Sequence, residues 1–167
     1  MSTAAPLPQD DSSLVIAAEM RADAQAIDAL VLRAFGPGRF AKTAERLRER
    51  AAQAEGFVAR SDGAIIGSVR LWDVSIGDAP ALFLGPIAVE RAARDSGVGA
   101  RLVQACVDHA RAERSTGILL IGDPPYFSRF GFVQAEDVRL SGPVDPRRLL
   151  WLSVTQNTPE GLVAPLI

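Results

Sequence analysis

The sequence is poor in residues that bind metals or act as nucleophiles. It has one cysteine, Cys106, and one histidine, His109, in 167 residues. A lone cysteine excludes an internal disulfide and a cysteine-based metal cluster, and with one histidine it argues against a zinc site or a Cys–His catalytic pair. Cys106 lies on the apolar side of a helical pattern and His109 lies off it, which predicts a small core residue and a surface residue. We therefore expect no metal.

Long apolar runs and a strong charge of one sign are also missing. No apolar stretch reaches the roughly 20 residues of a membrane span, and the N-terminus lacks the basic and apolar regions of a signal peptide. The formal net charge is −2 and charged residues make up 23% of the chain. Nothing in this balance indicates nucleic acid or a membrane as a partner, and we expect a cytoplasmic protein.

The chain has enough apolar residues for one compact core. Its 167 residues, 48% of them hydrophobic, suit a single domain. Residues 1–13 are rich in Ala, Pro, Ser and Asp and predict a loose tail, which leaves 14–167 as the domain.

Periodicity and turn residues predict the order of the elements. Asp62-Gly63 between two apolar runs indicates a β-hairpin. Strands are expected at 14–18, 57–60, 64–74, 82–89, 117–122, 132–140 and 149–155, and helices at 23–35, at 43–53, up to Arg111 and after Pro124. This order predicts an α+β fold, an α/β sandwich whose mixed, mostly antiparallel sheet has about seven strands and helices on both faces.

The stretch 82–111 reads as a strand, a glycine-bearing loop and a helix. Gly97 and Gly99 fall at the helix N-terminus, where free N–H groups and the helix dipole bind anions and glycine lets the backbone approach a ligand. No Gly-Lys-Ser/Thr triplet of a Walker loop occurs, and Leu102 stands where a dinucleotide-binding loop needs a small residue. Residues 94–99 instead match the pattern Arg/Gln-x-x-Gly-x-Gly/Ala.

This pattern resembles motif A of the GNAT superfamily of acyl-CoA-dependent N-acyltransferases. Pro86 lacks an N–H and interrupts the strand after Gly85, which is similar to the bulge that splays the family's fourth strand from its fifth. The segment 123–132 resembles motif B, a short helix that carries tyrosine and ends in Gly-Phe. The resemblance covers about residues 82–132 and predicts that the strand with Pro86 is parallel to the strand at 118–122 but splayed from it.

The resemblance implies a GNAT fold and transfer of an acetyl group from acetyl-CoA to a primary amine, on a small molecule or a protein, by direct attack. The loop's backbone N–H groups are expected to hold the coenzyme A pyrophosphate. The preceding strand is expected to bind pantetheine or the carbonyl oxygen. The residues concerned are Ile87, Ala88, Val89, Arg94, Asp95, Ser96, Gly97, Val98, Gly99 and Ala100.

The expected general acid is where this chain departs from the family. A tyrosine commonly lies four residues before the glycine of Gly-Phe, and that position is Phe127, which has no proton to give. Tyr126 is the only tyrosine of the chain, and one residue is about 100° of rotation on a helix. Either a shifted helix brings Tyr126 to the sulfur, or water protonates the thiolate, or the protein does not catalyse. The last case leaves an acyl-CoA-binding or sensing module, and an unrelated nucleotide-binding domain is a third hypothesis.

The general base is open as well. Asp123 ends the fifth predicted strand and is one candidate. An aspartate before Pro124 also fits a helix cap, and we favour the cap.

Two further segments have alternative interpretations. Basic residues interleave with Glu45 and Glu49, and a solvated helix face is favoured over a site for an acidic substrate. The basic residues are Arg39, Lys42, Arg46, Arg48 and Arg50.

The apolar strand at 149–152 is expected to be exposed and able to pair across a homodimer.

Overall fold

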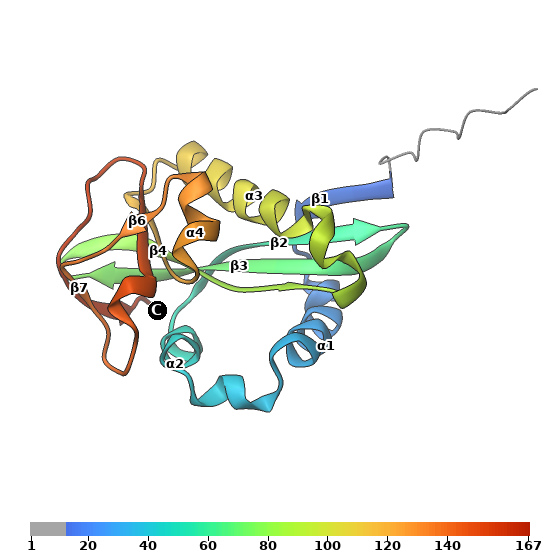
Figure 1. The fold of residues 1–167 in the computed structure, drawn as a ribbon, viewed down its shortest axis with the longest axis horizontal. Coiled ribbons are helices and arrows are strands. Elements are labelled where there is room, and N and C mark those ends of the chain that lie inside the picture. The colour runs from blue at the N-terminus through green and yellow to red at the C-terminus, as the bar shows by residue number, and fades with distance from the viewer. Residues whose placement is uncertain (1–12) are drawn as a thin grey trace, which may run out of the picture.

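The computed structural model describes residues 13–167, so the predicted tail lies outside it up to residue 12. Four antiparallel strands form the long central part of the sheet (Figure 1). They are β1 (Leu14–Ala18), β2 (Gln53–Ser61), β3 (Ala64–Ile76) and β4 (Ala79–Val89). Asp62 and Gly63 join β2 to β3 with φ angles of 49° and 82°, as a two-residue hairpin turn requires. The predicted hairpin is confirmed.

The C-terminal part extends the sheet beyond β4, in the order β1-β2-β3-β4-β5-β8-β6. β5 (Gly117–Ile121) is parallel to β4, and β8 (Leu149–Ser153) is antiparallel to both β5 and β6 (Val133–Gln134). β9 (Gly161–Pro165) pairs with the end of β3 and with β7 (Val138–Arg139). The sheet is mixed and mostly antiparallel, which confirms the predicted fold class.

Helices cover both faces of the sheet (Figure 1). α1 (Ala24–Phe35) and α2 (Thr43–Arg50) lie on one face, and α3 (Val98–Ala112) and α4 (Pro124–Phe127) lie on the other. Short 3-10 segments span Arg21–Asp23, Pro37–Ala41, Arg91–Ser96, Ser128–Phe130 and Pro146–Arg148. No helix within residues 13–167 has both the length and the apolar character to cross a membrane.

α3 packs through the apolar face that its periodicity predicts. The side chains of Leu102, Val103, Cys106, Val107 and Ala110 are at most 2% exposed. Burial raises the pKa of the Cys106 thiol, so this residue is the expected inert core residue. His109 differs from the prediction because it is half-buried, with its ring centroid 6.0 Å from that of Phe57.

Three of the differences from the predicted elements are large. The second helix ends at Arg50 because Gln53 already pairs with Trp72 in the sheet. The strand expected at 132–140 is divided between β6 and β7, which pair with different partners. β9 was not predicted at all, because its five residues follow a polar loop and show no clear alternation.

β8 is an interior strand, which corrects the interpretation of residues 149–152 as exposed. It pairs with β5 on one side and β6 on the other. Trp151 is fully buried and its indole N–H donates to the Ser153 hydroxyl at 3.0 Å. The residues therefore serve the core, and the reason given for a homodimer does not hold.

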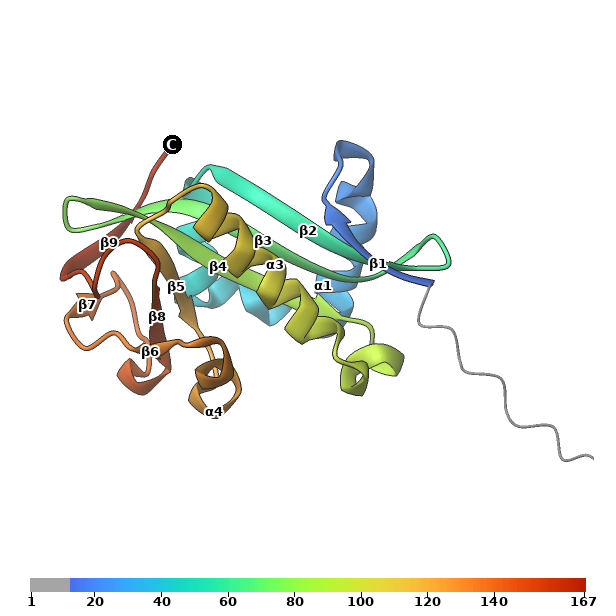
Figure 2. The ribbon, with the colours of Figure 1, turned by 90° about the horizontal axis from the view of Figure 1, so that it is seen from above.

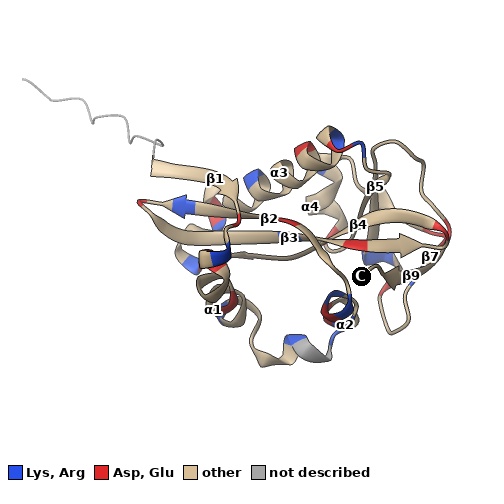
Figure 3. Cartoon of the chain, turned by 180° about the vertical axis from the view of Figure 1, so that it is seen from behind, with Lys and Arg blue, Asp and Glu red and all other residues tan. Residues whose placement is uncertain are grey.

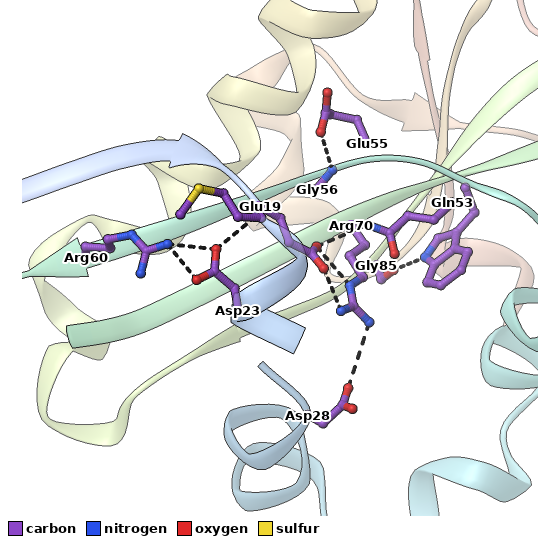
Figure 4. Close-up of polar contacts among 11 residues, drawn as sticks. Glu19, Asp23, Asp28, Gln53, Glu55, Gly56, Arg60, Arg70 and Gly85 are labelled. Atoms are coloured by element: carbon purple, nitrogen blue, oxygen red, sulfur yellow. Dashed lines mark hydrogen bonds and ion pairs between the residues drawn. The ribbon is translucent and has the colours of Figure 1, made fainter. Parts of the chain in front are cut away.

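A polar network ties the start of α1 to the sheet (Figure 4). Arg60 donates to both carboxylate oxygens of Asp23 at 2.7 Å, and Arg70 pairs with Glu19 at 2.8 Å. The Arg60 hydrogen bond, with a further one from the Met20 N–H, holds the pKa of Asp23 below its usual range. Charge-assisted contacts of this kind fix the position of α1 over β3 and β4.

Candidate active site

β4 and β5 separate half-way along β4. Their parallel register comprises Leu82 with Ile118 and Phe83 with Leu119, and it ends there. Seen from above, β5 turns away from β4 toward α4 (Figure 2). We call residues 79–84 the closed half of β4, because they pair with β3 and include Leu82 and Phe83, which also pair with β5. We call residues 87–89 the open half, because they pair with β3 alone. The predicted splay is confirmed.

A bulge at Gly85 and Pro86 divides the two halves. On β3, Val69 pairs with Ile87 and Leu71 pairs with Leu84, so two residues of β4 occupy the space of one residue on β3. The Gly85–Pro86 peptide is cis, and Gly85 has a φ of 138° that favours glycine. The Trp72 indole N–H donates to the Gly85 carbonyl at 2.5 Å (Figure 4). Side-chain and backbone chemistry together hold the bulge in place.

The open half presents unpaired N–H groups toward β5. The Glu90 N–H donates to the Ile66 carbonyl of β3 at 2.7 Å. Because successive N–H groups of a strand point in opposite directions, those of Val89 and Ile87 face away from β3. The Ala88 N–H faces β3, and its side chain is 2% exposed and packs with α1. Ile87 and Val89 are thus the donors that the opening offers.

The glycine-bearing loop follows the open half directly. Gly97 has a φ of 82° and stands just before α3, whose first N–H groups have no side-chain cap among the described residues. A Cβ on Gly97 would meet open space, whereas one on Gly99 would lie 3.3 Å from the Tyr126 hydroxyl. The Arg94 Nε donates to the Val89 carbonyl at 3.3 Å. An uncapped helix N-terminus in an open loop fits a phosphate group.

Exposure varies along this loop. Arg94, Asp95, Ser96 and Gly97 are exposed, Gly99 and Ala100 are half-buried, and Val98 is buried. The Val98 side chain is 1% exposed and packs in the core beneath α3, so its contribution to a ligand is limited to the backbone.

Tyr126 and Phe127 point to different places. The Tyr126 hydroxyl lies beside Gly99, and the Arg129 guanidinium lies 4.3 Å from the centre of the Tyr126 ring. Phe127 is 8% exposed and lines a cavity beside the open half. The two rings meet edge-on with centroids 4.9 Å apart. Phenylalanine therefore occupies the cavity wall where the resemblance places a proton donor, and the role of Tyr126 stays a prediction.

Asp123 lies at the N-cap position of α4 but does not cap the helix with its side chain. Its backbone carbonyl accepts the N–H groups of Tyr126 and Phe127 at 3.1 and 3.0 Å. The favoured cap interpretation was wrong, because the backbone makes the turn that the carboxylate was expected to make. The carboxylate is left exposed at the edge of the cavity.

The cavity has a volume of about 360 Å³ and opens beside the bulge. Its walls come from α1, α2 and the segment between them, from the bulge of β4, from the end of β5 and from α4. They comprise Phe35, Arg39, Lys42, Ala44, Arg48, Phe83, Leu84, Gly85, Pro86, Ile87, Leu120, Ile121, Gly122, Asp123, Phe127 and Arg148. This volume suits a small molecule.

The basic stretch is partly buried, which corrects the prediction of a solvated helix face. Arg39 and Arg48 both donate to one oxygen of Glu45 at 2.9 Å, and their side chains are 17% and 11% exposed. Arg46 and Arg50 are exposed, and Figure 3 shows that α2 carries both basic and acidic residues. The i,i+4 spacing of the charged residues did not predict this burial, because spacing alone does not indicate which face of the helix meets the sheet.

Sequence reasoning also missed Arg148. It lies in a loop far along the chain, and its Nε donates to the Gly122 carbonyl at the end of β5 at 3.3 Å. No motif marks it, because its place in the cavity wall depends on the pairing of β8 with β5.

Comparison with known proteins agrees with this geometry. A model of the Acetyltransferase (GNAT) family matches residues 24–132. The chain therefore belongs to the GNAT family of N-acetyltransferases. The uncharacterized N-acetyltransferase YhbS of Escherichia coli strain K12 is 33% identical over 135 residues, which are 78% of this chain and 81% of that protein.

Two solved structures extend the likeness. The structure of Escherichia coli YhbS in complex with CoA has a TM-score of 0.80 at 30% identity and covers 92% of this chain and 90% of that one. A GNAT acetyltransferase from Brucella melitensis in complex with acetyl-CoA has a TM-score of 0.71 at 26% identity, with 90% and 94% covered. Structural neighbours of this chain thus bind CoA or acetyl-CoA.

Proposed function

We propose that the protein transfers the acetyl group of acetyl-CoA to a primary amine by direct attack. The observation that carries the proposal is the continuity of the opening. The glycine-bearing loop lies at one end of the open half of β4, and the cavity lies at the other end. A long donor molecule needs an anion site, an edge for its extended arm and space for a second substrate, in this order.

Each part of the opening has its own task in this proposal. The N–H groups at the start of α3 bind the pyrophosphate. The Ile87 and Val89 N–H groups bind the pantetheine arm or polarise the thioester carbonyl, where negative charge develops during attack. Holding both substrates in one cavity supplies several kcal/mol of the barrier reduction through positioning alone.

Two proton transfers complete the reaction. The amine must lose a proton as it forms the new C–N bond, and the departing thiolate must gain one. We propose Asp123 as the base, because it is the one carboxylate among the described residues that line the cavity. We propose Tyr126 as the acid, because its hydroxyl borders Gly99 and the open half of β4.

One observation favours a second function. Phe127, not a proton donor, stands in the cavity wall, and this suits a module that binds acyl-CoA without transferring the acyl group. Such a protein would bind CoA as tightly as an enzyme does but would release no thiol.

A paired experiment tests the proposal. Thiol release from acetyl-CoA is measured over a broad amine panel, with mass spectrometry of the acetylated product and a control without amine. Thermal shift with CoA, NAD and ATP is measured on the same protein. Acetylated product together with a shift for CoA alone supports transfer. A CoA shift without product supports the binding module, and a shift for NAD or ATP without one for CoA contradicts both.

A further inference from the structure

The cavity beside the bulge carries an excess of positive charge. Among the described residues, four cationic side chains line it, from α2, the segment before α2 and the 3-10 segment before β8, and Asp123 is the one carboxylate. The cations are Arg39, Lys42, Arg48 and Arg148. A concave wall of one sign attracts ligands of the other sign.

Ion pairs among the described residues do not match every one of these cations. Glu45 accepts from Arg48 and also from Arg39, so Arg48 shares its carboxylate. Neither Lys42 nor Arg148 lies within ion-pair distance of an acidic side chain in the described part of the chain. Both are exposed at the cavity wall, where a bound anion can meet the Lys42 ammonium and the terminal nitrogens of Arg148 while the Arg148 Nε keeps its hydrogen bond to the Gly122 carbonyl.

Arg48 is the innermost of these cations. Its side chain is 11% exposed, and its Nε has no hydrogen-bond partner among the described residues. A Cβ on Gly85 would lie 3.1 Å from its terminal nitrogen, so the guanidinium reaches the bulge where β4 opens. Burial lowers the pKa of Arg48, yet a guanidinium keeps its charge in proteins and binds carboxylate and phosphate oxygens in a fork.

The phosphates of the acyl donor do not account for these cations. No residue of the loop 94–100 lines the cavity. The open half of β4 separates the loop from the bulge, and four residues of strand from Gly85 to Val89 span about 13 Å. The cations therefore face the end of the opening where the second substrate enters.

We propose that the acceptor is a small amine that also carries an anionic group, a carboxylate or a phosphate, which Lys42, Arg48 and Arg148 bind. This inference rests on the proposed acetyl transfer and specifies its acceptor. The volume of about 360 Å³ suits a small acceptor. Asp123 at the edge of the same cavity receives the amine, so one molecule with both charges spans the site.

Matched acceptor pairs test the proposal. kcat/KM is measured with acetyl-CoA for each of the common amino acids against its amide, and for phosphoethanolamine against ethanolamine. The amide has a less basic amine, which is more often neutral and ready to attack, so amine basicity works against the expected result. We expect at least a tenfold preference for the anionic member, and the amino acid and phosphoethanolamine arms distinguish carboxylate from phosphate.

Variants of the exposed cations tie this preference to the cavity. Lys42→Gln and Arg148→Gln should each reduce the ratio of kcat/KM between the anionic and neutral members at least threefold, mainly through KM. Arg46→Gln is the matched control, because Arg46 is an exposed cation of α2 that does not line the cavity. Because these side chains are exposed, the variants are expected to fold, which thermal unfolding checks.

Each outcome of these experiments either supports or overturns the proposal. Acetylation of neutral members as fast as anionic ones, or an unchanged ratio in both cavity variants, overturns this inference and leaves the proposed transfer standing. Binding of acetyl-CoA with no acetylation of any panel member overturns the proposed transfer to small amines and this inference with it.

Discussion

The two halves of β4 have different tasks although they belong to one strand. The closed half has a neighbour on each side and side chains that are at most 6% exposed from Ala81 to Leu84. The open half has β3 on one side and unpaired donors on the other. The bulge at Gly85 and Pro86 allows this change within two residues. A strand that is rigid where it is closed holds the donors of its open half in position before a ligand arrives.

The largest expected effect is a difference in stability between a variant of the closed half and a variant of the open half. Phe83→Ala should lower the free energy of unfolding by about 3–5 kcal/mol, because Phe83 is 1% exposed in a packed cluster. Ile87→Ala should cost less than about 2 kcal/mol, because Ile87 is half-buried beside the opening. Urea unfolding of both variants measures the difference. Equal costs would show that the open half is as well packed as the closed half.

The next effect tests the loop beyond the open half. Gly99→Val should weaken CoA binding by about 100-fold or more, because a branched side chain would fill the space at the helix N-terminus. Gly99 does not require a positive φ, but a Cβ there would lie 3.3 Å from the Tyr126 hydroxyl, so the Tyr126 side chain must shift slightly for the unliganded fold to accept the change. Calorimetry gives the affinity, and thermal unfolding is the control. Wild-type affinity in this variant would refute the assignment of the loop.

A variant of Tyr126 tests whether its hydroxyl is the general acid. If its hydroxyl donates the proton, Tyr126→Phe should lower kcat by about 10²-fold and leave CoA affinity nearly unchanged. Full activity would exclude the role. Phe127→Tyr is the complementary variant, and a gain in kcat there would identify the cavity wall as the better place for the donor.

A smaller effect is expected for Arg94. Its side chain is exposed and donates to the Val89 carbonyl, and the proposed pyrophosphate contacts come from the backbone. Arg94→Ala should therefore weaken CoA by less than about tenfold. A loss of CoA affinity as large as that of Gly99→Val in the same calorimetric assay would show that the Arg94 side chain, and not the backbone, makes the main pyrophosphate contact.

The smallest effect concerns the network that holds α1 over β3 and β4. Asp23 has a lowered pKa because Arg60 hydrogen-bonds its carboxylate. Its stabilisation is therefore present above the unfolded pKa of about 3.9 and is lost as pH falls through the lower folded pKa. Asp23→Asn should be less stable than wild type at pH 7, and the gap should close in denaturation curves below about pH 4. A gap that persists there would assign the effect to packing.

The comparison also indicates what the sequence predicts and what it does not. The splay followed from Pro86, because a missing N–H acts locally, and the core face of α3 followed from its period. The side-chain cap predicted for Asp123 was wrong, because its backbone carbonyl, not its carboxylate, accepts the N–H groups of Tyr126 and Phe127. Arg48 was misjudged and Arg148 was missed because contacts between distant segments place the Arg48 guanidinium beside Gly85 and bring Arg148 to the end of β5. Tertiary pairing, which no local pattern encodes, decided these positions.

The most direct test of the account is residue-resolved amide hydrogen exchange with and without CoA. We predict that CoA slows exchange at Ile87, at Val89 and at residues 98–100 by at least about tenfold, because these N–H groups gain an acceptor. The Ala88 N–H already faces β3, and Phe83 lies in the closed half. The exchange rates of both N–H groups should therefore change little. CoA binding that protects Ala88 and Phe83 as much as Ile87 and Val89, or that leaves 98–100 unchanged, would contradict it.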